Sequence, residues 1–478
     1  MNKILALLFL FASVATYSLA QGTIVEDTVV LHLNFEEIDE LLSDNGIPPG
    51  ILPINYEVDI HRVVYVTPNV DGTPTTASGL ICLPTGDTCA MPMMSYLHGT
   101  KVEKNSTFYY LNGEWNLGVM TATHGYAMCL PDYLGLGLSP GIHPYQHAES
   151  EATASIDLMR ACRTICDDLQ LELNDQLFLV GYSQGGHSVM ATHRKIQEEL
   201  SSEFTVTASA PGSGPYDMSG EQLDMVASFE PYAQPGYLPY LIQSYQHVYG
   251  NLYDNIEEIY VSPYDVTLPP LLDGNSNMGD LNAAMPSVPR LIFQQDYQDA
   301  FFSDPQHPAQ IALRDNDVYE WVPQAPVMFN YCRSDEEVTY LNTIVASEYM
   351  IAAGAADIQV IERDSTIGHF ACASPSILFS KLWFDTMADF CSSDVGIGSV
   401  SREMPLSFYP NPNASGVLSF ENARQIEVSI MNLEGKRITE LTSVDSGGFL
   451  DVSFLRSGLY LVEMLDGENR VVKPVVIR

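Results

Sequence analysis

The pattern of apolar and polar positions between residues 56 and 200 switches repeatedly between strand-like and helix-like segments. Polar and apolar residues alternate over 56–66, as in a half-buried strand. Short apolar runs bounded by Pro, Gly or polar residues indicate further strands at 77–83, 91–97, 125–130 and 177–180. Residues 152–169 and 184–200 have helical spacing instead. Strands that alternate with helices predict an α/β fold with a mainly parallel sheet and helices on both faces.

This alternation stops between residues 212 and 322, where Tyr, Pro and Leu are frequent, for example in 235–242. An insertion of this length within a regular fold is commonly functional, and we expect a cap over the site. The pattern of strands and helices then resumes, with strands at 327–332 and 358–361 and a helix near 378–390.

The first twenty residues have the features of a secretory signal peptide. A positively charged start precedes an apolar stretch over residues 4–15, and Ser18-Leu19-Ala20 offers small residues for cleavage. The apolar stretch is shorter than the ~20 residues that a membrane helix needs. Since no later segment has the pattern of a span, we expect the mature chain to have no transmembrane span.

The other end of the chain changes character after Cys391. Small residues dominate 392–402 and predict a linker. Beyond it, short strand-like segments are separated by Asn, Gly and Asp, at 417–420, 426–433, 449–454, 459–464 and 471–477. This spacing predicts a second domain over 403–478 with a small β-sandwich fold.

The chain is strongly acidic, with 60 Asp and Glu against 21 Lys and Arg and a formal net charge of −39. Such a charge repels phosphate backbones, so we expect no nucleic-acid partner. A dense acidic surface also keeps an exported protein soluble, and this explanation needs no cationic partner.

Eight cysteines, an even number in an exported chain, permit disulfides. Their pairing is not determined by the sequence. Cys82 with Cys89 would close a small loop, and Cys372 with Cys391 would fasten the end of the central domain. No CxxC or HExxH spacing supports a metal site, and we expect neither a metal nor a cofactor.

The most specific motif is Gly181-Tyr182-Ser183-Gln184-Gly185, which fits G-x-S-x-G. It lies where a buried strand meets a helix, and small flanking residues allow the sharp turn that holds a serine hydroxyl above the sheet. Serine is a weak nucleophile at neutral pH, so it needs an imidazole to accept its proton and a carboxylate to orient that imidazole. Ser183 is therefore the predicted nucleophile.

For a serine at such a turn, the expected chain order is serine, acid and then histidine. The acid is predicted to be Asp335, which follows an apolar strand, with Glu336 as the second choice. His369 follows the next strand and is predicted to be the base. His187 lies four residues after Ser183 on the same helix, but that helix leads away from the hydroxyl, so we expect its side chain to pack.

The oxyanion that forms in acyl transfer needs preorganised hydrogen-bond donors. One is predicted to be the backbone N–H of Gln184, the residue after the nucleophile. Gly99 and Thr100 follow the strand at 91–97 and occupy the second expected place, where glycine lets the backbone approach a substrate oxygen. An ordinary tight turn at this place is the alternative.

Three sequence stretches together resemble the α/β-hydrolase superfamily, nearest to its secretory lipase and esterase members. They are PDYLGLGLS at 131–139, GYSQGG at 181–186 and APGSGPYD at 210–217. The resemblance covers roughly residues 51–391 and implies hydrolysis without a cofactor, through an acyl-enzyme. It also implies that Asp132 supports the structure. We accordingly expect a catalytic domain over 21–391.

The last domain resembles a different family, the C-terminal sorting domain of type IX secretion. The resemblance rests on segments at 408–413, 428–436, 457–461 and 473–478. It implies the type IX secretion machinery as a partner and export to the medium or the cell surface. A carbohydrate-binding or adhesive sandwich is the alternative, although no aromatic platform is evident.

The sequence thus predicts an exported serine hydrolase that cleaves carboxylic esters, with an apolar acyl or alcohol pocket lined by the cap. The nucleophile motif is shared with serine peptidases, so a prolyl or aminopeptidase remains an alternative. A non-catalytic surface or adhesion protein on a hydrolase scaffold is a third, less favoured because Ser183, Asp335 and His369 occur in the required order.

Overall fold

The computed structural model describes two stretches of the chain with gaps. The first consists of residues 20–45, 47, 52–86 and 89–390. The second consists of 407–409, 413, 415–421, 425–431, 437–445, 447–456, 458–466 and 469–477. The predicted signal peptide up to residue 19, the predicted linker at 392–402 and Cys391 lie outside the described residues.

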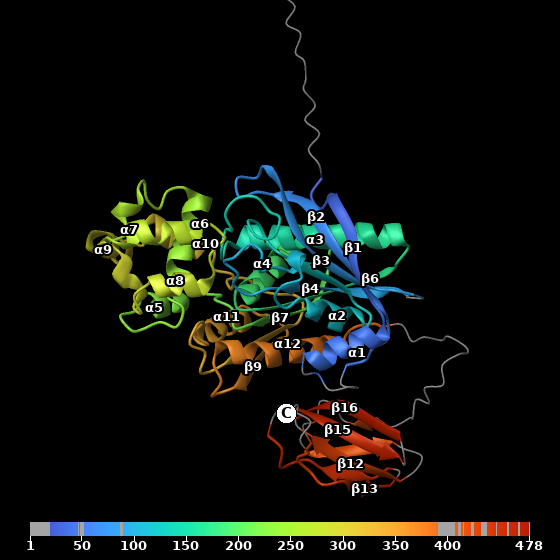
Figure 1. Cartoon of the computed structure of the whole chain (residues 1–478). Helices are drawn as coiled ribbons and strands as arrows, with labels where there is room; N and C mark the ends of the chain where they lie inside the picture. Colours follow the sequence, from blue (N-terminus) through green and yellow to red (C-terminus); the bar gives the residue numbers. More distant parts are fainter. Residues whose placement is uncertain are drawn as a thin grey trace, which may run out of the picture.

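The larger part is built on one twisted sheet (Figure 1) with the spatial order β1-β2-β3-β5-β4-β6-β7-β8-β9. Its strands are Ile24–Leu33 (β1), Val58–Pro68 (β2), Pro74–Pro84 (β3), Met91–Leu97 (β4), Ala127–Pro131 (β5), Leu173–Tyr182 (β6), Val206–Gly212 (β7), Val327–Cys332 (β8) and Ile358–Asp364 (β9). The first four in this spatial order pair antiparallel, and all further pairs are parallel.

Helices cover both faces of this sheet, as the alternating pattern predicts. They are Phe35–Asp44 (α1), Asn116–Ala122 (α2), Ala148–Leu169 (α3), Gln184–Glu199 (α4), Leu341–Ala352 (α11) and His369–Asp385 (α12). α3 and α4 pack one apolar core against the sheet, and α1, α2 and α12 pack a second core on the opposite face. Every residue of β4 is buried, which explains its continuous apolar sequence.

A group of short helices is inserted between β7 and β8, and Figure 1 shows them gathered to one side of the sheet. They are Glu221–Val226 (α5), Tyr237–Tyr249 (α6), Tyr264–Thr267 (α7), Met278–Ala284 (α8), Gln295–Ser303 (α9) and Pro308–Asp315 (α10), with three 3₁₀ turns among them. We call this insertion the cap. It has its own apolar core, in which Tyr245, Leu268 and Ile292 are buried.

The C-terminal part forms two antiparallel sheets, β10-β11-β14 and β13-β12-β15-β16. Their strands are Ser407–Tyr409 (β10), Val417–Glu421 (β11), Ile426–Met431 (β12), Thr442–Val444 (β13), Phe449–Asp451 (β14), Gly458–Asp466 (β15) and Asn469–Ile477 (β16). Residues of both sheets, such as Phe420 and Val462, share one core. The predicted fold class, an α/β sheet followed by a small β domain, is confirmed.

One predicted element is misplaced. A helix was expected near 378–390, but α12 begins at His369 and ends at Asp385. Gly368 and Pro375 lower the helix propensity of its first turns, and so conceal its start in the sequence. The helix forms there because its first two turns pack beside β6 and β8.

Candidate active site

Ser183 lies on a strained turn between β6 and α4. Its backbone has φ 61° and ψ −125°, a conformation that non-glycine residues rarely adopt. Neighbouring glycines make this turn possible: a Cβ atom on Gly185 would lie 1.8 Å from the carbonyl oxygen of Leu97, and one on Gly181 would lie 2.4 Å from that of Gly185. The G-x-S-x-G spacing is thus a steric requirement of the turn that presents Ser183.

Asp335 and His369 lie side by side, as the sequence predicted. Asp335 follows β8, and His369 is the first residue of α12. Asp335 Oδ2 lies 2.7 Å from His369 Nδ1, and both residues are buried. The other carboxylate oxygen of Asp335 accepts the backbone N–H groups of Glu337 and Val338, at 3.0 and 2.9 Å. This arrangement fixes the imidazole and directs its Nε2 away from the acid.

Glu336, the second choice for the acid, has a different contact. Its Oε2 accepts the backbone N–H of His369 at 2.9 Å, so it holds the start of α12 and does not reach the ring. A Cβ atom on Gly368 would lie 2.3 Å from the same carboxylate oxygen. Glu336 therefore supports the position of the histidine, while Asp335 orients its ring.

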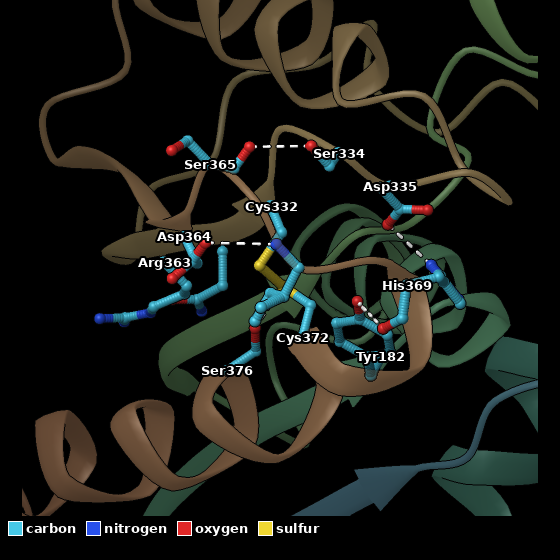
Figure 2. The surroundings of a disulfide bond; sticks show 12 residues. Tyr182, Cys332, Ser334, Asp335, Arg363, Asp364, Ser365, His369, Cys372 and Ser376 are labelled. Atoms are coloured by element: carbon cyan, nitrogen blue, oxygen red, sulfur yellow. Dashed lines mark hydrogen bonds and ion pairs between the residues drawn. A yellow bond between two sulfur atoms is a disulfide. The ribbon is translucent and has the colours of Figure 1, made fainter.

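A disulfide fastens the two segments that carry this pair (Figure 2). Cys332 at the end of β8 is bonded to Cys372 in the first turn of α12, with an S–S distance of 2.05 Å. Tyr182, the residue before Ser183, donates its hydroxyl to the carbonyl oxygen of His369 at 2.8 Å. These two contacts tie the acid loop, the histidine and the end of β6 together.

Both suggested cysteine pairings are therefore wrong. Cys372 is bonded to Cys332 instead of Cys391, because β8 and α12 are brought together by the sheet. Cys82 is a free thiol, whereas Cys89 is disulfide-bonded, so these two do not pair. Cys82 is fully buried on β3, where a Cβ atom on Gly118 would lie only 2.6 Å from its Sγ. That side chain is packed against α2.

The surroundings of His369 favour its charged form. Burial lowers its pKa, but the hydrogen bond to Asp335 and the charges of Asp335, Glu337 and Glu336 outweigh burial, so the pKa is raised above its ordinary value of 6.5. A base with a raised pKa holds an accepted proton more firmly. The imidazole is neutral only above that pKa.

Glu337 was not identified from the sequence, and it faces the other nitrogen of the histidine. Its Oε2 lies 3.9 Å from His369 Nε2, and the residue is only 8% exposed. The signal was present as the third acidic residue of Asp335-Glu336-Glu337. The spacing of residues in the sequence does not show that the side chains of Asp335 and Glu337 would lie on either side of the His369 ring.

The predicted oxyanion residues lie beside Ser183. A Cβ atom on Gly99 would lie 3.6 Å from Ser183 Cβ, so the loop after β4 passes directly over the serine. The backbone N–H of Gln184 is in the first turn of α4, where amides have no partner within the helix. The hydroxyls of Thr100 and Tyr145 are 3.1 Å apart. Two backbone segments therefore converge near Ser183.

His98 fixes the position of this loop. Its Nδ1 lies 2.6 Å from the Gly99 carbonyl oxygen, and its Nε2 lies 3.2 Å from the carbonyl oxygen of Asp132. Burial lowers the pKa of His98 to about 4. Asp132 is also buried, which raises its pKa to about 6, and it accepts the hydroxyl of Ser78 at 2.7 Å. These contacts agree with a supporting role for Asp132.

His187 is not available to the serine. It is fully buried, with Nδ1 2.9 Å from Glu151 Oε2 and Nε2 2.9 Å from the carbonyl oxygen of Asn316. Glu151 also accepts from the side chains of Gln184, at 2.7 Å, and Ser188, at 2.6 Å. This buried network lies behind the turn at Ser183 and joins α3, α4 and the end of the cap.

Two hollow spaces meet at Ser183. The first, which we call the cap cavity, has a volume of about 70 Å³ and extends from Ser183 between the cap helices. Its lining is almost entirely apolar and includes Leu223, Val226, Leu238, Leu241, Ile242, Phe293, Phe301 and Leu313. The second, which we call the cleft, has a volume of about 900 Å³ and contains Gly99, Thr100, Glu337 and His369. Ser183 and Tyr237 line both spaces.

The sheet order, the serine on a strained turn between β6 and α4, and the acid and histidine after β8 and β9 define the class of α/β hydrolases. Solved structures agree with this class. LipA of Xanthomonas oryzae is 30% identical, with 77% of this chain and 98% of that chain covered and a TM-score of 0.68. A protein of Legionella pneumophila is 27% identical, with 76% and 97% covered and a TM-score of 0.70.

Lipase A of Candida antarctica shares the fold at 16% identity, with 77% of this chain and 82% of that chain covered and a TM-score of 0.59. The identity and coverage of the LipA match show that the chain belongs to the α/β-hydrolase superfamily, among its secretory lipase- and esterase-like members. It is a hydrolase. A comparison with curated proteins finds no match.

The end of the chain belongs to a second family. Residues 407–478 match the secretion system C-terminal sorting domain, which confirms the resemblance to sorting domains of type IX secretion. The protein is therefore exported, to the medium or the cell surface, and the secretion machinery is its partner. Among the described residues, no helix has both the length and the apolar composition to cross a membrane.

Proposed function

We propose that the protein is an exported serine esterase or lipase that cleaves carboxylic esters through an acyl-enzyme on Ser183. Asp335 orients His369, which acts as general base and then as general acid. The observation that carries the proposal is the 2.7 Å contact between Asp335 and His369 in the cleft that Ser183 also lines. The predicted domain arrangement, with the cap over about 212–322 of a catalytic domain at 21–391, belongs to the same proposal.

The reaction consists of two acyl transfers. In the first, Ser183 Oγ attacks the carbonyl carbon, His369 Nε2 takes the serine proton, and this proton then passes to the leaving alcohol as the C–O bond breaks. In the second, water gives a proton to Nε2 and attacks the acyl-enzyme, and the carboxylic acid leaves as Ser183 regains its proton. Asp335 remains ionised and stabilises the imidazolium in both.

The oxyanion of each tetrahedral intermediate would be held by backbone donors. The N–H of Gln184 supplies one, and the loop at Gly99 and Thr100 supplies another. Their support is the close approach of Gly99 to Ser183 and the position of Gln184 at the start of α4. The dipole of α4 favours negative charge at the same place.

The cap cavity supports an apolar acyl chain as the group that Ser183 binds. It begins at Ser183, and its walls are mostly aliphatic and aromatic side chains of α5, α6, α9 and α10, with Gln222, Gln298 and Arg290 among them. Transfer of such a chain from water is favourable by about 0.8 kcal/mol for each buried CH₂ group. The cleft on the other side of Ser183 contains His369, so it is the side from which the leaving alcohol can be protonated.

The relatives support esters over amides as substrates. LipA of X. oryzae is described as an esterase that degrades rice cell walls, and the Candida protein is described as a lipase. The mostly apolar walls of the cap cavity also suit an acyl chain.

Labelling with a fluorophosphonate tests the proposal. We expect one adduct on Ser183 by mass spectrometry, no adduct in Ser183→Ala, and normal labelling in the control Ser303→Ala, an exposed serine of the cap. Turnover of p-nitrophenyl esters should depend on Ser183 by a factor of about 10⁴ or more. Turnover confined to aminoacyl or prolyl amides would contradict the ester assignment, and unchanged turnover in Ser183→Ala would contradict serine catalysis.

A further inference from the structure

Glu337 has no part in the two acyl transfers proposed above, yet its carboxylate lies close to the histidine that acts as base. Its Oε2 lies 3.9 Å from His369 Nε2, the nitrogen that must take the proton of Ser183. This distance is too long for a hydrogen bond but short enough for a strong interaction between charges. With Asp335 at Nδ1, the imidazole lies between two carboxylates.

The cap holds Glu337 at this distance. Oε2 accepts the hydroxyl of Tyr237 at 2.8 Å, and Oε1 accepts the side-chain amide of Gln234 at 2.8 Å. The backbone carbonyl of Glu337 accepts two further cap donors, the Tyr232 hydroxyl at 2.6 Å and the Gln222 amide at 3.0 Å. Four side chains of the cap therefore fix a residue that belongs to the loop after β8.

The position of the carboxylate has two opposite effects on the base. Its charge favours the imidazolium that forms when Ser183 is deprotonated. If the carboxylate came closer, it would accept a hydrogen bond from His369 Nε2–H. That bond would compete with Ser183 for the same nitrogen. The hydrogen bonds from Tyr237 and Gln234 compensate the negative charge of Glu337 and keep its carboxylate from moving closer to His369 Nε2.

The other charged and titratable groups around His369 do not provide a carboxylate that the cap holds near Nε2. Asp335 and Glu336 approach from the same loop, at the ring Nδ1 and the backbone N–H, and Tyr182 approaches from β6 at the backbone carbonyl. Lys101, Glu114 and Lys381 line the same cleft. In the described structure, Glu337 is the carboxylate that combines contact with Nε2 and hydrogen bonds from the cap.

We propose that Glu337 is a positioning residue through which the cap controls the catalytic base: Tyr237 and Gln234 hold its carboxylate near enough to favour imidazolium and far enough to leave Nε2 to Ser183. The inference rests on the proposed function. It means that the seating of the cap against the loop after β8 sets the activity of the histidine.

The test compares the pH dependence of kcat/KM for an ester in the wild-type protein, Glu337→Gln, Tyr237→Phe and the double variant. We expect the acid limb of Glu337→Gln to move to lower pH by about one unit, because a favourable charge near the imidazolium is lost. Tyr237→Phe should move the limb to higher pH and lower kcat, because the carboxylate is released towards Nε2. In the double variant the effect of Tyr237→Phe should vanish.

Tyr253→Phe is the matched control, since Tyr253 is a half-buried tyrosine that packs against the apolar core of the cap. Its acid limb should stay at the wild-type pH. Fluorophosphonate titration of each variant gives the concentration of folded sites, so loss of folding is separated from a change in the base. An unmoved acid limb in Glu337→Gln, or a Tyr237→Phe shift that persists in the double variant, would overturn the inference. Failure of the wild-type protein to label at Ser183 would instead overturn the proposed function.

Discussion

The disulfide between Cys332 and Cys372 should stabilise the catalytic domain and hold the Asp335–His369 pair in register. Replacement of both cysteines by alanine opens a loop with a sequence separation of 40. For a closed loop of this size, the loss of chain entropy in the unfolded state corresponds to about 4 kcal/mol at 25 °C. A change of this size should lower Tm by roughly 5–10 °C in a domain of several hundred residues.

Activity should fall more than stability alone explains. Cys332 lies three positions before Asp335, and Cys372 lies three positions after His369. Without the disulfide, β8 and α12 are joined near this pair only by hydrogen bonds and packing. A displacement of about 1 Å in a catalytic group can cost about 10²-fold in rate, and we expect kcat/KM to fall by about 10–100-fold.

Thermal unfolding followed by circular dichroism and ester hydrolysis below the new Tm measure the two effects separately. Cys82→Ala is the control, because Cys82 is a buried free thiol and its loss opens no loop. Both bonded cysteines are fully buried, so reductant should inactivate the wild-type protein only when it is also unfolded. If the variant with Cys332→Ala and Cys372→Ala keeps the wild-type Tm and kcat/KM, the disulfide neither stabilises the domain nor positions the Asp335–His369 pair.

Three further predictions concern the base, the cap cavity and the nucleophile turn. Since the pKa of His369 is raised above 6.5, kcat/KM should decline on acidification already above pH 6.5, and a profile that is level down to pH 5 would contradict the role of His369 as base. Ile242→Trp adds a bulky side chain to the wall of the cap cavity, so turnover of long-chain p-nitrophenyl esters should fall by about tenfold or more while that of acetate esters is retained; equal losses for both chain lengths would exclude the cavity as the acyl site. Gly185→Ala would bring a Cβ atom to 1.8 Å from the Leu97 carbonyl, and should cost at least ~3 kcal/mol in chemical unfolding together with loss of labelling at Ser183; near-normal stability would show that the turn is less constrained than described.

The sheet and the strained turn at Ser183 were predictable because their causes are local or periodic. Continuous apolar runs gave strands such as β4 and β8, and the order of Ser183, Asp335 and His369 follows from the order of strands in the sheet. The outer strand β1 was missed. Most of its residues are partly or fully exposed, so it lacks the apolar run of a central strand.

The choice between Asp335 and Glu336 could be ranked but not decided from the sequence. The two residues are adjacent, and both carry carboxylates that contact His369, one at the ring and one at the backbone. Only the path of the loop after β8 distinguishes them. Glu337 was overlooked for the same reason, since its partners Tyr237 and Gln234 come from an insertion about a hundred positions earlier.

The sequence by itself therefore determined the class of fold, the C-terminal sorting domain and the strained turn at Ser183. Each depends on neighbouring residues: periodic burial, a sorting motif, or glycines that leave room for a backbone. The disulfide pairing, the cap cavity and the environment of His369 were decided by the tertiary structure. They depend on distances between segments far apart in the chain, and those distances are fixed only when strands, α12 and the cap pack around a common core.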